Sequence, residues 1–229
     1  MQDMGFIFAW PKRETLENAL KDADLVHIQF PFLLGYRTLS IARKMGKPVV
    51  LGFHVQPENL MWNIGLNHNR VISFLYRFFV KTFYNKGDIV LSPSSLGKIM
   101  LEENGINVPV EVISNGLPEQ FKPGDYDPDP KFKDKFVILM AGRLAREKRH
   151  DAVIQAIQKS KHQDNIQLVV TGKGHLREEL EKLGESLAVP PLFTYVSQKE
   201  LIRLFNTAHL FIHASEVELE GMAVLEAIG

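Results

Sequence analysis

Short apolar runs rich in β-branched residues alternate with stretches of helical periodicity along most of the chain. In the first half, these patterns predict strands over 24–30, 48–53, 88–91 and 111–113, and helices over 35–44 and 94–103. In the second half, they predict strands over 136–140, 167–170, 193–196 and 209–213, and helices over about 149–161, 175–187 and 198–206. Strands that alternate with helices are typical of parallel α/β units, so the sequence predicts an α/β fold.

The segment 63–86 departs from this rhythm because it is long, rich in phenylalanine and interspersed with basic residues. Its apolar positions are consistent with one or two helices. Two interpretations stay open. The segment is either a helix of the core or, together with Trp62 and the Phe-rich stretch 74–83, an interfacial amphipathic helix of a peripheral membrane-binding module.

A change of composition divides the chain into two parts. Between Leu117 and Lys135 the sequence contains four prolines, many charged residues and little periodic apolar content. Such a segment is typical of a linker between domains. We therefore predict a first lobe over 1–117, a linker over 118–135 and a second lobe over 136–229.

The composition excludes several classes of protein. With 229 residues, 45% of them apolar and 24% charged, the chain has the balance of a soluble globular protein. Lys and Arg together number 27, as do Asp and Glu, so no net field favours nucleic acid as a partner. The chain has no cysteine, which excludes disulfides and thiolate metal sites. No apolar run approaches the roughly 18–20 residues of a membrane span and the start lacks a signal-peptide pattern, so we expect a cytoplasmic protein.

The first candidate site follows the strand predicted over 136–140. Ligands of parallel sheets bind beyond the carboxyl ends of the strands. There, Gly142 would let the backbone approach a ligand, and Arg143 and Lys148 would hold an anion. A planar guanidinium and a compact ammonium together suit a pyrophosphate. A solvated basic loop is the alternative, but the position directly after a strand favours the site.

The strand predicted over 167–170 leads to a second glycine-containing turn on the same edge of the sheet. Gly172 and Gly174 flank a lysine there and open the next predicted helix. Two glycines at this spacing are weak evidence for a ligand, because glycine often only makes a tight strand-to-helix turn. Both interpretations stay open.

The last stretch of the chain, 214–229, places Glu218 before Gly221 and Glu226 within the helix that begins there. A helix N-terminus offers N–H groups and a positive dipole end to an anion. Glu218 would then bind hydroxyls of a group attached to that anion, and Glu226 would reach a ribose diol. The alternative is that both glutamates are surface charges that the helix dipole favours.

In the first lobe, His54 and Glu58 follow the strand predicted over 48–53. A histidine there is a hydrogen-bond donor, an acid/base group or a packed loop residue. The serines at 92–95 and the turn at 114–116 also end strands, and the former could cap the next helix. The eight histidines show no close H-x-x-x-H pair, so we predict no metal site.

Taken together, these stretches resemble family 4 glycosyltransferases of the GT-B fold. The second lobe is similar to that family in GRLAREKR, VVTGKGHLREELEKL, FTYVSQKELIRLFNTAHLFIHAS and EVELEGMAVLEA. The first lobe is similar to the acceptor lobe in VHIQFPFLLG, KPVVLGFHVQPENL, SPSSLGKIMLEENGI and VISNGL, especially in the branch that glycosylates diacylglycerol or phosphatidylinositol. The resemblance implies two Rossmann-like parallel-sheet lobes that face a cleft.

The resemblance also implies a reaction, the transfer of a sugar from a nucleotide diphosphate sugar with retention of configuration. The family roles make Arg143 and Lys148 the diphosphate clamp, Glu218 and the Gly221 region the sugar and phosphate contacts, Glu226 the ribose contact, and His54 a contact to the donor sugar. The family mechanism needs no protein nucleophile, because the departing phosphate takes the acceptor's proton on the same face. It implies no cofactor, and no metal where Arg143 and Lys148 neutralise the leaving group.

The chain departs from the family pattern in several places. Glu220 stands where an aromatic residue is usual, and His209 stands where an acid is usual. In the family, a first strand with a glycine-rich loop would precede Met1, and further strands with a crossover helix would follow Gly229. Both lobes therefore look incomplete, and a catalytically impaired sugar-nucleotide-binding fragment is the alternative to an active transferase.

The expected partners follow from the resemblance. They are a nucleotide-sugar donor and an acceptor that is a membrane lipid or a glycan, with no nucleic acid. A lipid acceptor implies peripheral contact with the inner face of the membrane. The sequence leaves open the nucleotide base, the sugar and the identity of the acceptor.

Overall fold

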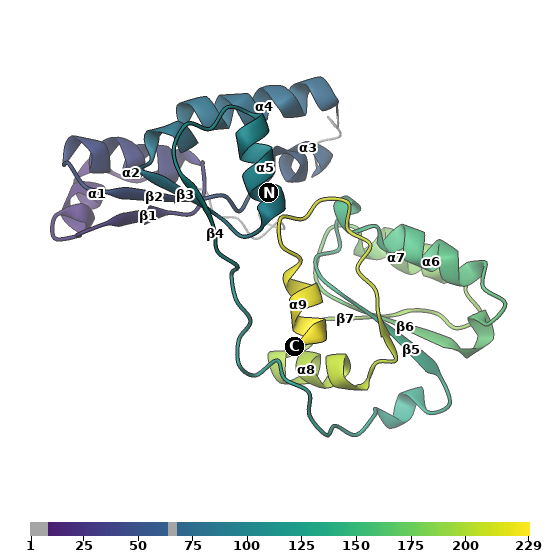
Figure 1. The fold of residues 1–229 in the computed structure, drawn as a ribbon. Coiled ribbons are helices and arrows are strands. Elements are labelled where there is room, and N and C mark those ends of the chain that lie inside the picture. The colour runs from purple at the N-terminus through teal and green to yellow at the C-terminus, as the bar shows by residue number, and fades with distance from the viewer. Residues whose placement is uncertain (1–8, 64–67) are drawn as a thin grey trace. The chain divides into compact units, whose positions relative to one another are not determined.

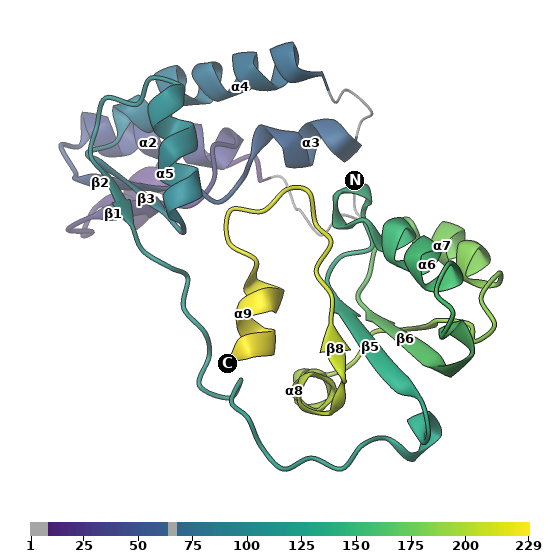
Figure 2. The ribbon, with the colours of Figure 1, turned by 45° about the vertical axis from the view of Figure 1, so that its right-hand side comes forward.

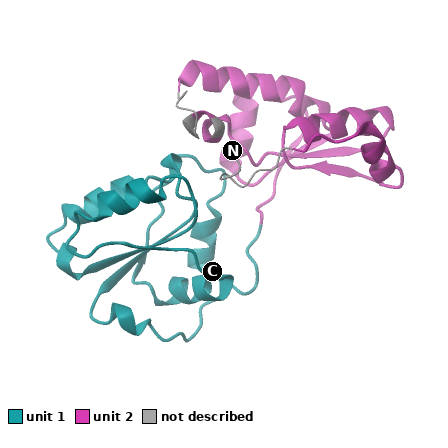
Figure 3. Ribbon diagram, turned by 180° about the vertical axis from the view of Figure 1, so that it is seen from behind, with its two compact units in different colours: residues 1, 3, 116–229 teal, residues 2, 4–115 magenta. Residues whose placement is uncertain are grey.

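The computed structural model describes residues 9–63 and 68–229, except for the side chains of residues 60, 62 and 63. The hypothesis for Trp62 therefore concerns a side chain outside this description. The chain divides into two compact units between Asn115 and Gly116 (Figure 3). Each unit contains one four-stranded parallel sheet with helices between its strands, which confirms the predicted α/β fold.

The first lobe has the strand order β1-β2-β3-β4. Its strands are β1 (Val26–Ile28), β2 (Val49–Gly52), β3 (Ile89–Ser92) and β4 (Val110–Val112). Its helices are α1 (Arg13–Leu20), α2 (Leu33–Lys44), α3 (Pro57–Asn63), α4 (Asn69–Thr82) and α5 (Ser95–Glu103). Each strand and helix predicted for this lobe has a counterpart here, whereas α1 and α3 were not predicted from the sequence. Pro57 begins α3, at the position where proline is best tolerated in a helix.

The core of the first lobe lies around its central strands. Val49 and Leu51 of β2 are both fully buried, and Phe53 follows them. The ring of Phe53 meets that of Tyr84 edge to face, with 5.5 Å between centroids. Because α4 leads into this aromatic cluster and buries Tyr76 against it, the helix is anchored to the sheet. Within the described residues, no helix is both long and apolar enough to cross a membrane.

The second lobe has the strand order β7-β6-β5-β8 (Figures 1 and 2). Its strands are β5 (Phe136–Ala141), β6 (Ile166–Thr171), β7 (Leu192–Thr194) and β8 (Leu210–Phe211). Its helices are α6 (His150–Gln158), α7 (Arg177–Gly184), α8 (Gln198–Thr207) and α9 (Met222–Ile228). Figure 1 shows α6 and α7 together on one side of this sheet and α8 on the other.

The alternation of side chains along β5 explains these two layers. Ile138 and Met140 belong to the core that α6 and α7 cover, whereas Val137 and Leu139 pack with Leu204 of α8. Successive residues of a strand point to opposite faces, so a strand that is buried on both sides needs a continuous apolar run. β5 has such a run in Phe136–Ala141.

The strand order also creates a switch point in the second lobe. The chain adds β6 and β7 on one side of β5 and then returns to place β8 on the other side. Connections that leave β5 and β8 therefore diverge at their carboxyl ends. Ligands of parallel α/β sheets bind in the crevice that such a divergence opens.

Segment 118–135, which the sequence analysis predicted as a linker, packs along α8. Phe121 is buried and its ring meets that of Phe205 at 6.1 Å between centroids. The backbone N–H of Gly124 donates to Asn206 Oδ1 at 2.8 Å. The segment contains one short 3₁₀ turn, Pro130–Phe132, and belongs to the same compact unit as the second lobe, unit 1 of Figure 3.

The turns after β5 and β6 pack backbone against backbone. The N–H of Gly142 donates to Thr171 O at 3.0 Å, and the N–H of Leu144 donates to Lys173 O at 2.9 Å. A Cβ on Gly172 would lie 1.8 Å from the carbonyl oxygen of Gly142. A Cβ on Gly174 would likewise lie 2.1 Å from that of Leu144. Close packing therefore explains both glycines without a ligand, as the structural alternative proposed.

We expect Gly172→Ala to destabilise the protein by about 3 kcal/mol or more, because the new methyl group meets rigid backbone. Gly105→Ala is the matched control. Gly105 has a positive φ of 85° but nothing within 4 Å of a Cβ, so this change adds only the backbone penalty of about 1–2 kcal/mol. Urea denaturation measures both. Equal destabilisation by the two changes would contradict the steric argument.

Candidate functional site

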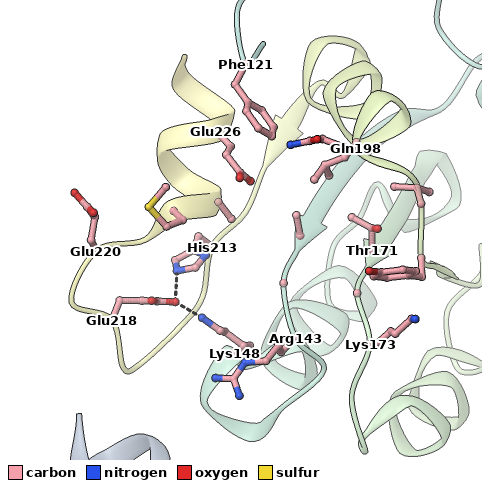
Figure 4. A pocket seen from close by; sticks show the side chains of 18 residues that line it. Phe121, Arg143, Lys148, Thr171, Lys173, Gln198, His213, Glu218, Glu220 and Glu226 are labelled. Carbon is pink, nitrogen blue, oxygen red and sulfur yellow. Dashed lines mark hydrogen bonds and ion pairs between the residues drawn. The ribbon is translucent and has the colours of Figure 1, made fainter. Parts of the chain in front are cut away.

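A pocket of about 680 Å³ opens at the carboxyl ends of the second-lobe strands (Figure 4). Six of the residues predicted for the site line it, namely Gly142, Arg143, Lys148, Gly172, Glu218 and Glu226. The predicted glycines Gly174 and Gly221 do not line it, and His54 belongs to the other lobe. The strand order thus brings the predicted cations and both predicted glutamates of the second lobe into one hollow.

Arg143 lies two residues beyond the end of β5 and is held by a buried acid. Its Nη2 donates to Glu147 Oε1 at 3.0 Å. The side chain of Glu147 is completely buried, and its Oε2 has no hydrogen-bond partner in the described structure. Because a buried carboxylate is costly unless it is paired, this contact fixes Arg143 at the edge of the pocket.

Lys148 forms an ion pair with Glu218, which lies 70 residues further along the chain. His213, which lies just after β8, places its Nε2 3.1 Å from the same Glu218 oxygen. Burial alone would raise the pKa of Glu218. The contacts with His213 and Lys148 outweigh burial, so the pKa lies below its ordinary value. Glu218 is therefore a carboxylate near neutral pH.

The loop after β5 is also tied to the loop after β8 by its backbone. The N–H of Glu216 donates to Glu147 O at 2.9 Å. Arg149 forms an ion pair with Glu216, although its φ of 51° is a conformation that non-glycine residues rarely adopt. These contacts hold the two loops together across the switch point.

Glu226 enters the pocket from α9 (Figure 4). Burial raises the pKa of its carboxyl above the ordinary value. Gly221 is the N-cap residue of this helix, so the helix begins where it was predicted to begin. Gly221 itself does not line the pocket, whereas the next two residues, Met222 and Ala223, do. The φ of Gly221 is −76°, so its backbone conformation does not require glycine.

Several lining residues were not predicted as site residues. They are Thr171, Lys173, Tyr195, Gln198 and His213, among others. Thr171 ends β6, Tyr195 follows β7 and His213 lies just after β8. All three lie at the carboxyl end of a predicted strand, and this position is the sequence signal that marks them. Nothing local marks Gln198, which opens α8.

In the first lobe, the ring of His54 folds back over Gly52, the last residue of β2. A Cβ on Gly52 would lie 2.6 Å from Cδ2 and Nε2 of that ring. The nearby Glu58 accepts a hydrogen bond from the hydroxyl of Tyr76 at 2.8 Å, so it serves packing between α3 and α4. Ser94 caps α5 by accepting from Gly97 N at 3.3 Å, which the sequence analysis offered as one interpretation.

The described residues contain no group of three His, Asp or Glu side chains arranged to hold a metal ion. The charged groups and the histidine that line the pocket are three cations, three glutamates and His213. Such a set suits an anion that carries hydroxyl groups, since the cations neutralise it and carboxylates accept from hydroxyls.

Comparison with known proteins decides the family. Residues 2–121 match the family model described as "Glycosyltransferase Family 4". Residues 125–229 match the family model described as "Glycosyl transferases group 1". The chain belongs to glycosyltransferase family 4. This family 4 chain is 26% identical over 219 residues to alpha-monoglucosyldiacylglycerol synthase of Streptococcus pneumoniae, covering 90% of the chain and 49% of that protein. It is 25% identical to a GDP-mannose-dependent alpha-mannosyltransferase of Corynebacterium glutamicum, covering 89% and 48%.

Solved structures place the family 4 chain in the GT-B fold, which confirms the predicted architecture. The crystal structure of Anabaena HepE in complex with UDP and glucose superposes with a TM-score of 0.70 at 16% identity, over 94% of this chain and 59% of that one. At this identity the likeness concerns the fold alone. The chain spans about half the length of the curated relatives it matches.

His150 begins α6 directly after the loop that carries Lys148. It is buried, and its Nδ1 has no hydrogen bond in the described structure. Burial, followed by the nearby charge of Lys148, lowers its pKa from 6.5 to about 4. His150 is therefore neutral near pH 7.

This pKa predicts acid sensitivity. Between pH 6.5 and about pH 4 the unfolded chain protonates His150 and the folded chain does not, so stability falls as the pH falls. At about 1.4 kcal/mol per pH unit, the interval corresponds to roughly 3 kcal/mol of unfolding free energy. We expect His150→Gln to lose this part of the acid sensitivity in urea titrations at several pH values. The exposed His162→Gln is the control, and an unchanged pH slope in His150→Gln would refute the assignment.

Proposed function

We propose that the pocket of the second lobe binds the nucleotide diphosphate sugar of a retaining glycosyltransferase. The observation that carries this proposal is the convergence of Arg143, Lys148, Glu218 and Glu226 on one pocket at the switch point of a family 4 chain. Two cations neutralise a diphosphate, and the glutamates at its sides accept from sugar and ribose hydroxyls.

The pairing of the cations suggests how the donor enters. Arg143 and Lys148 are already held by Glu147 and Glu218. A diphosphate would take over Lys148 as its partner and leave the carboxylate of Glu218 to accept from the hydroxyls of the transferred sugar. Glu226 would bind the ribose, and His54 of the first lobe would contact the donor sugar, as the family roles imply.

In this proposal the reaction needs positioning and charge stabilisation more than a protein nucleophile. The bond between the anomeric carbon and the β-phosphate oxygen breaks while the acceptor oxygen bonds to that carbon on the same face. The departing phosphate takes the acceptor's proton. Arg143 and Lys148 stabilise the charge that grows on the phosphate, so the step involves no metal and no cofactor.

The proposed acceptor is a membrane lipid. Two relatives of the chain are alpha-monoglucosyldiacylglycerol synthases, from Streptococcus pneumoniae and Acholeplasma laidlawii. With a lipid acceptor, the proposed enzyme would act from the cytoplasm, in peripheral contact with the inner face of the membrane. A glycan acceptor is the alternative.

We expect Lys148→Ala and Glu226→Ala each to weaken binding of a nucleoside diphosphate, measured by calorimetry with UDP, GDP and ADP. Loss of one charge-assisted contact costs about 1.5–3 kcal/mol, which corresponds to roughly 10- to 150-fold in affinity. Lys159→Ala is the control, because Lys159 is exposed and lies away from the pocket. Unchanged affinity in both pocket variants, or no binding of any of the three ligands, would contradict the donor site.

The exposed side of α4 supports contact with a membrane. The helix buries Ile72, Tyr76 and Val80. Its exposed apolar residues are Val71, Phe74 and Phe78. Its charged residues are all basic and exposed, namely Arg70, Arg77 and Lys81. At 3.6 residues per turn the exposed apolar and basic residues share the face opposite the core.

The geometry of this face fits an anionic lipid surface. Phe74 and Phe78 are 62% and 45% exposed, and their rings stack with 6.3 Å between centroids. Exposed aromatic rings bordered by basic residues are the composition of an interfacial helix. The two sequence interpretations of this segment are therefore compatible, because one face of α4 is core and the other is available to a membrane.

We expect the chain to sediment with vesicles that contain phosphatidylglycerol and only weakly with phosphatidylcholine alone. Replacing Arg70, Arg77 and Lys81 by Gln should weaken this binding by about 1 kcal/mol for each charge removed. Replacing Phe74 and Phe78 by Ser should abolish it, with little loss of stability because both rings are exposed.

A matched control replaces Lys133, Lys159 and Lys161 of the unit over 116–229 by Gln, since these lysines are also exposed. Equal weakening by the control triple and the α4 triple would show that only net charge matters. That result, or binding that does not depend on anionic lipid, would refute α4 as the membrane contact.

A further inference from the structure

His213 lines the second-lobe pocket but has no role in the proposed donor site. It lies just after β8, and its side chain is 18% exposed. Its Nε2 lies 3.1 Å from Oε1 of Glu218, the same oxygen to which Lys148 donates a hydrogen bond (Figure 4). Within the described residues, this nitrogen is buried and makes no hydrogen bond. One carboxylate oxygen therefore faces two nitrogens, and in the free protein the lysine is its hydrogen-bond donor.

Backbone pairing and ring packing hold the imidazole of His213 in place. The N–H of the preceding residue, Ile212, donates to Leu139 O at 2.9 Å and so ties this stretch to β5. The imidazole stacks on the ring of Phe211 with 6.3 Å between centroids, because residues two apart in an extended segment lie on the same side. Phe211 in turn meets Phe205 of α8 edge to face at 5.4 Å. The imidazole is thus the end of a packed column of rings.

The loop that follows His213 folds back around this nitrogen. A Cβ on Gly221 would lie 3.6 Å from Nε2 of the imidazole. At the other end of the loop, the N–H of Glu216 is fixed to Glu147 O at 2.9 Å. Glu218 lies between these two anchors, so its position beside the imidazole does not depend on Lys148 alone.

Lys148 and His213 differ in how easily they change partner. A lysine carries its charge on a flexible four-carbon stem, whereas this imidazole is packed on both sides of its segment. Burial raises the pKa of Glu218, and the contacts with His213 and Lys148 lower it. A partly buried carboxylate that lost its lysine to a diphosphate would be costly without another donor. The site therefore needs a partner for Glu218 that stays in place.

We propose that His213 is the positioning residue of Glu218, and that its Nε2 donates a hydrogen bond to this carboxylate when a diphosphate takes over Lys148. A neutral imidazole that carries its hydrogen on Nε2 can do this, as can a protonated one. The assignment rests on the proposed donor site. It adds to that site the group that keeps Glu218 charged and oriented for the hydroxyls of the transferred sugar.

Calorimetry with UDP, GDP and ADP tests this role. His213→Leu should weaken the nucleotides that the wild-type protein binds by roughly threefold to 30-fold, because their binding then leaves a buried carboxylate without a partner. His213→Gln should keep most of the wild-type affinity, since its amide N–H reaches about as far as Nε2. His209→Leu is the matched control. His209 lies at the other end of β8, accepts from Val137 N at 3.0 Å and lies outside the pocket.

A double-mutant cycle with Glu218→Gln isolates the contact between the two side chains. With a neutral amide at position 218 no charge is left unpaired, so the addition of His213→Leu should change affinity by less than about twofold. Circular dichroism checks that each variant is folded. If His213→Leu unfolds, His213→Asn takes its place, because the shorter amide does not reach Glu218.

Four results would overturn the role of His213. They are unchanged affinity in His213→Leu, an equal loss in His213→Gln, an equal loss in His209→Leu, and an undiminished loss in the Glu218→Gln background. A failure of the donor site itself looks different. In that case the wild-type protein binds none of the three nucleotides, or Lys148→Ala leaves their affinity unchanged. If only the role of His213 is wrong, Lys148→Ala still weakens them.

Discussion

Ion pairs between and within the loops that follow β5 and β8 hold the pocket of the second lobe. Lys148 pairs with Glu218 across the switch point, and Arg143 pairs with the fully buried Glu147. A backbone hydrogen bond from Glu216 to Glu147 joins the same two loops. Because a buried carboxylate without a partner is costly, these side chains are fixed before any ligand binds. Binding of a diphosphate would then need little reordering of the cations.

The backbone beneath these charges is equally constrained. Gly172 and Gly174 let the turn after β6 lie directly against the turn after β5, where any larger residue would collide with a carbonyl oxygen. The turns therefore act as one rigid floor rather than as separate loops. His150 continues this floor into α6 and stays neutral beneath Lys148 because it is buried. Packing and electrostatics thus support the same arrangement.

The two lobes contribute different chemistry to the proposed transferase. The pocket of the second lobe is lined by Arg143, Lys148, Glu218 and Glu226, which suits a ligand that carries phosphates and hydroxyl groups. The first lobe carries His54 folded over Gly52, and α4 exposes phenylalanines and basic residues opposite its core face. These features agree with the proposal that the second lobe binds the donor and that the first lobe contacts the lipid surface that supplies the acceptor.

The sequence by itself determined the class of fold, because the alternation of apolar runs and periodic stretches is a local property of the chain. It also determined that Gly142, Arg143 and Lys148 follow a strand, and parallel strands end at one edge of a sheet. It could not show that Lys148 meets Glu218, since residues 70 apart become neighbours only through the strand order β7-β6-β5-β8. The burial of Glu147 and the convergence of Tyr195 and Gln198 were decided by tertiary structure for the same reason.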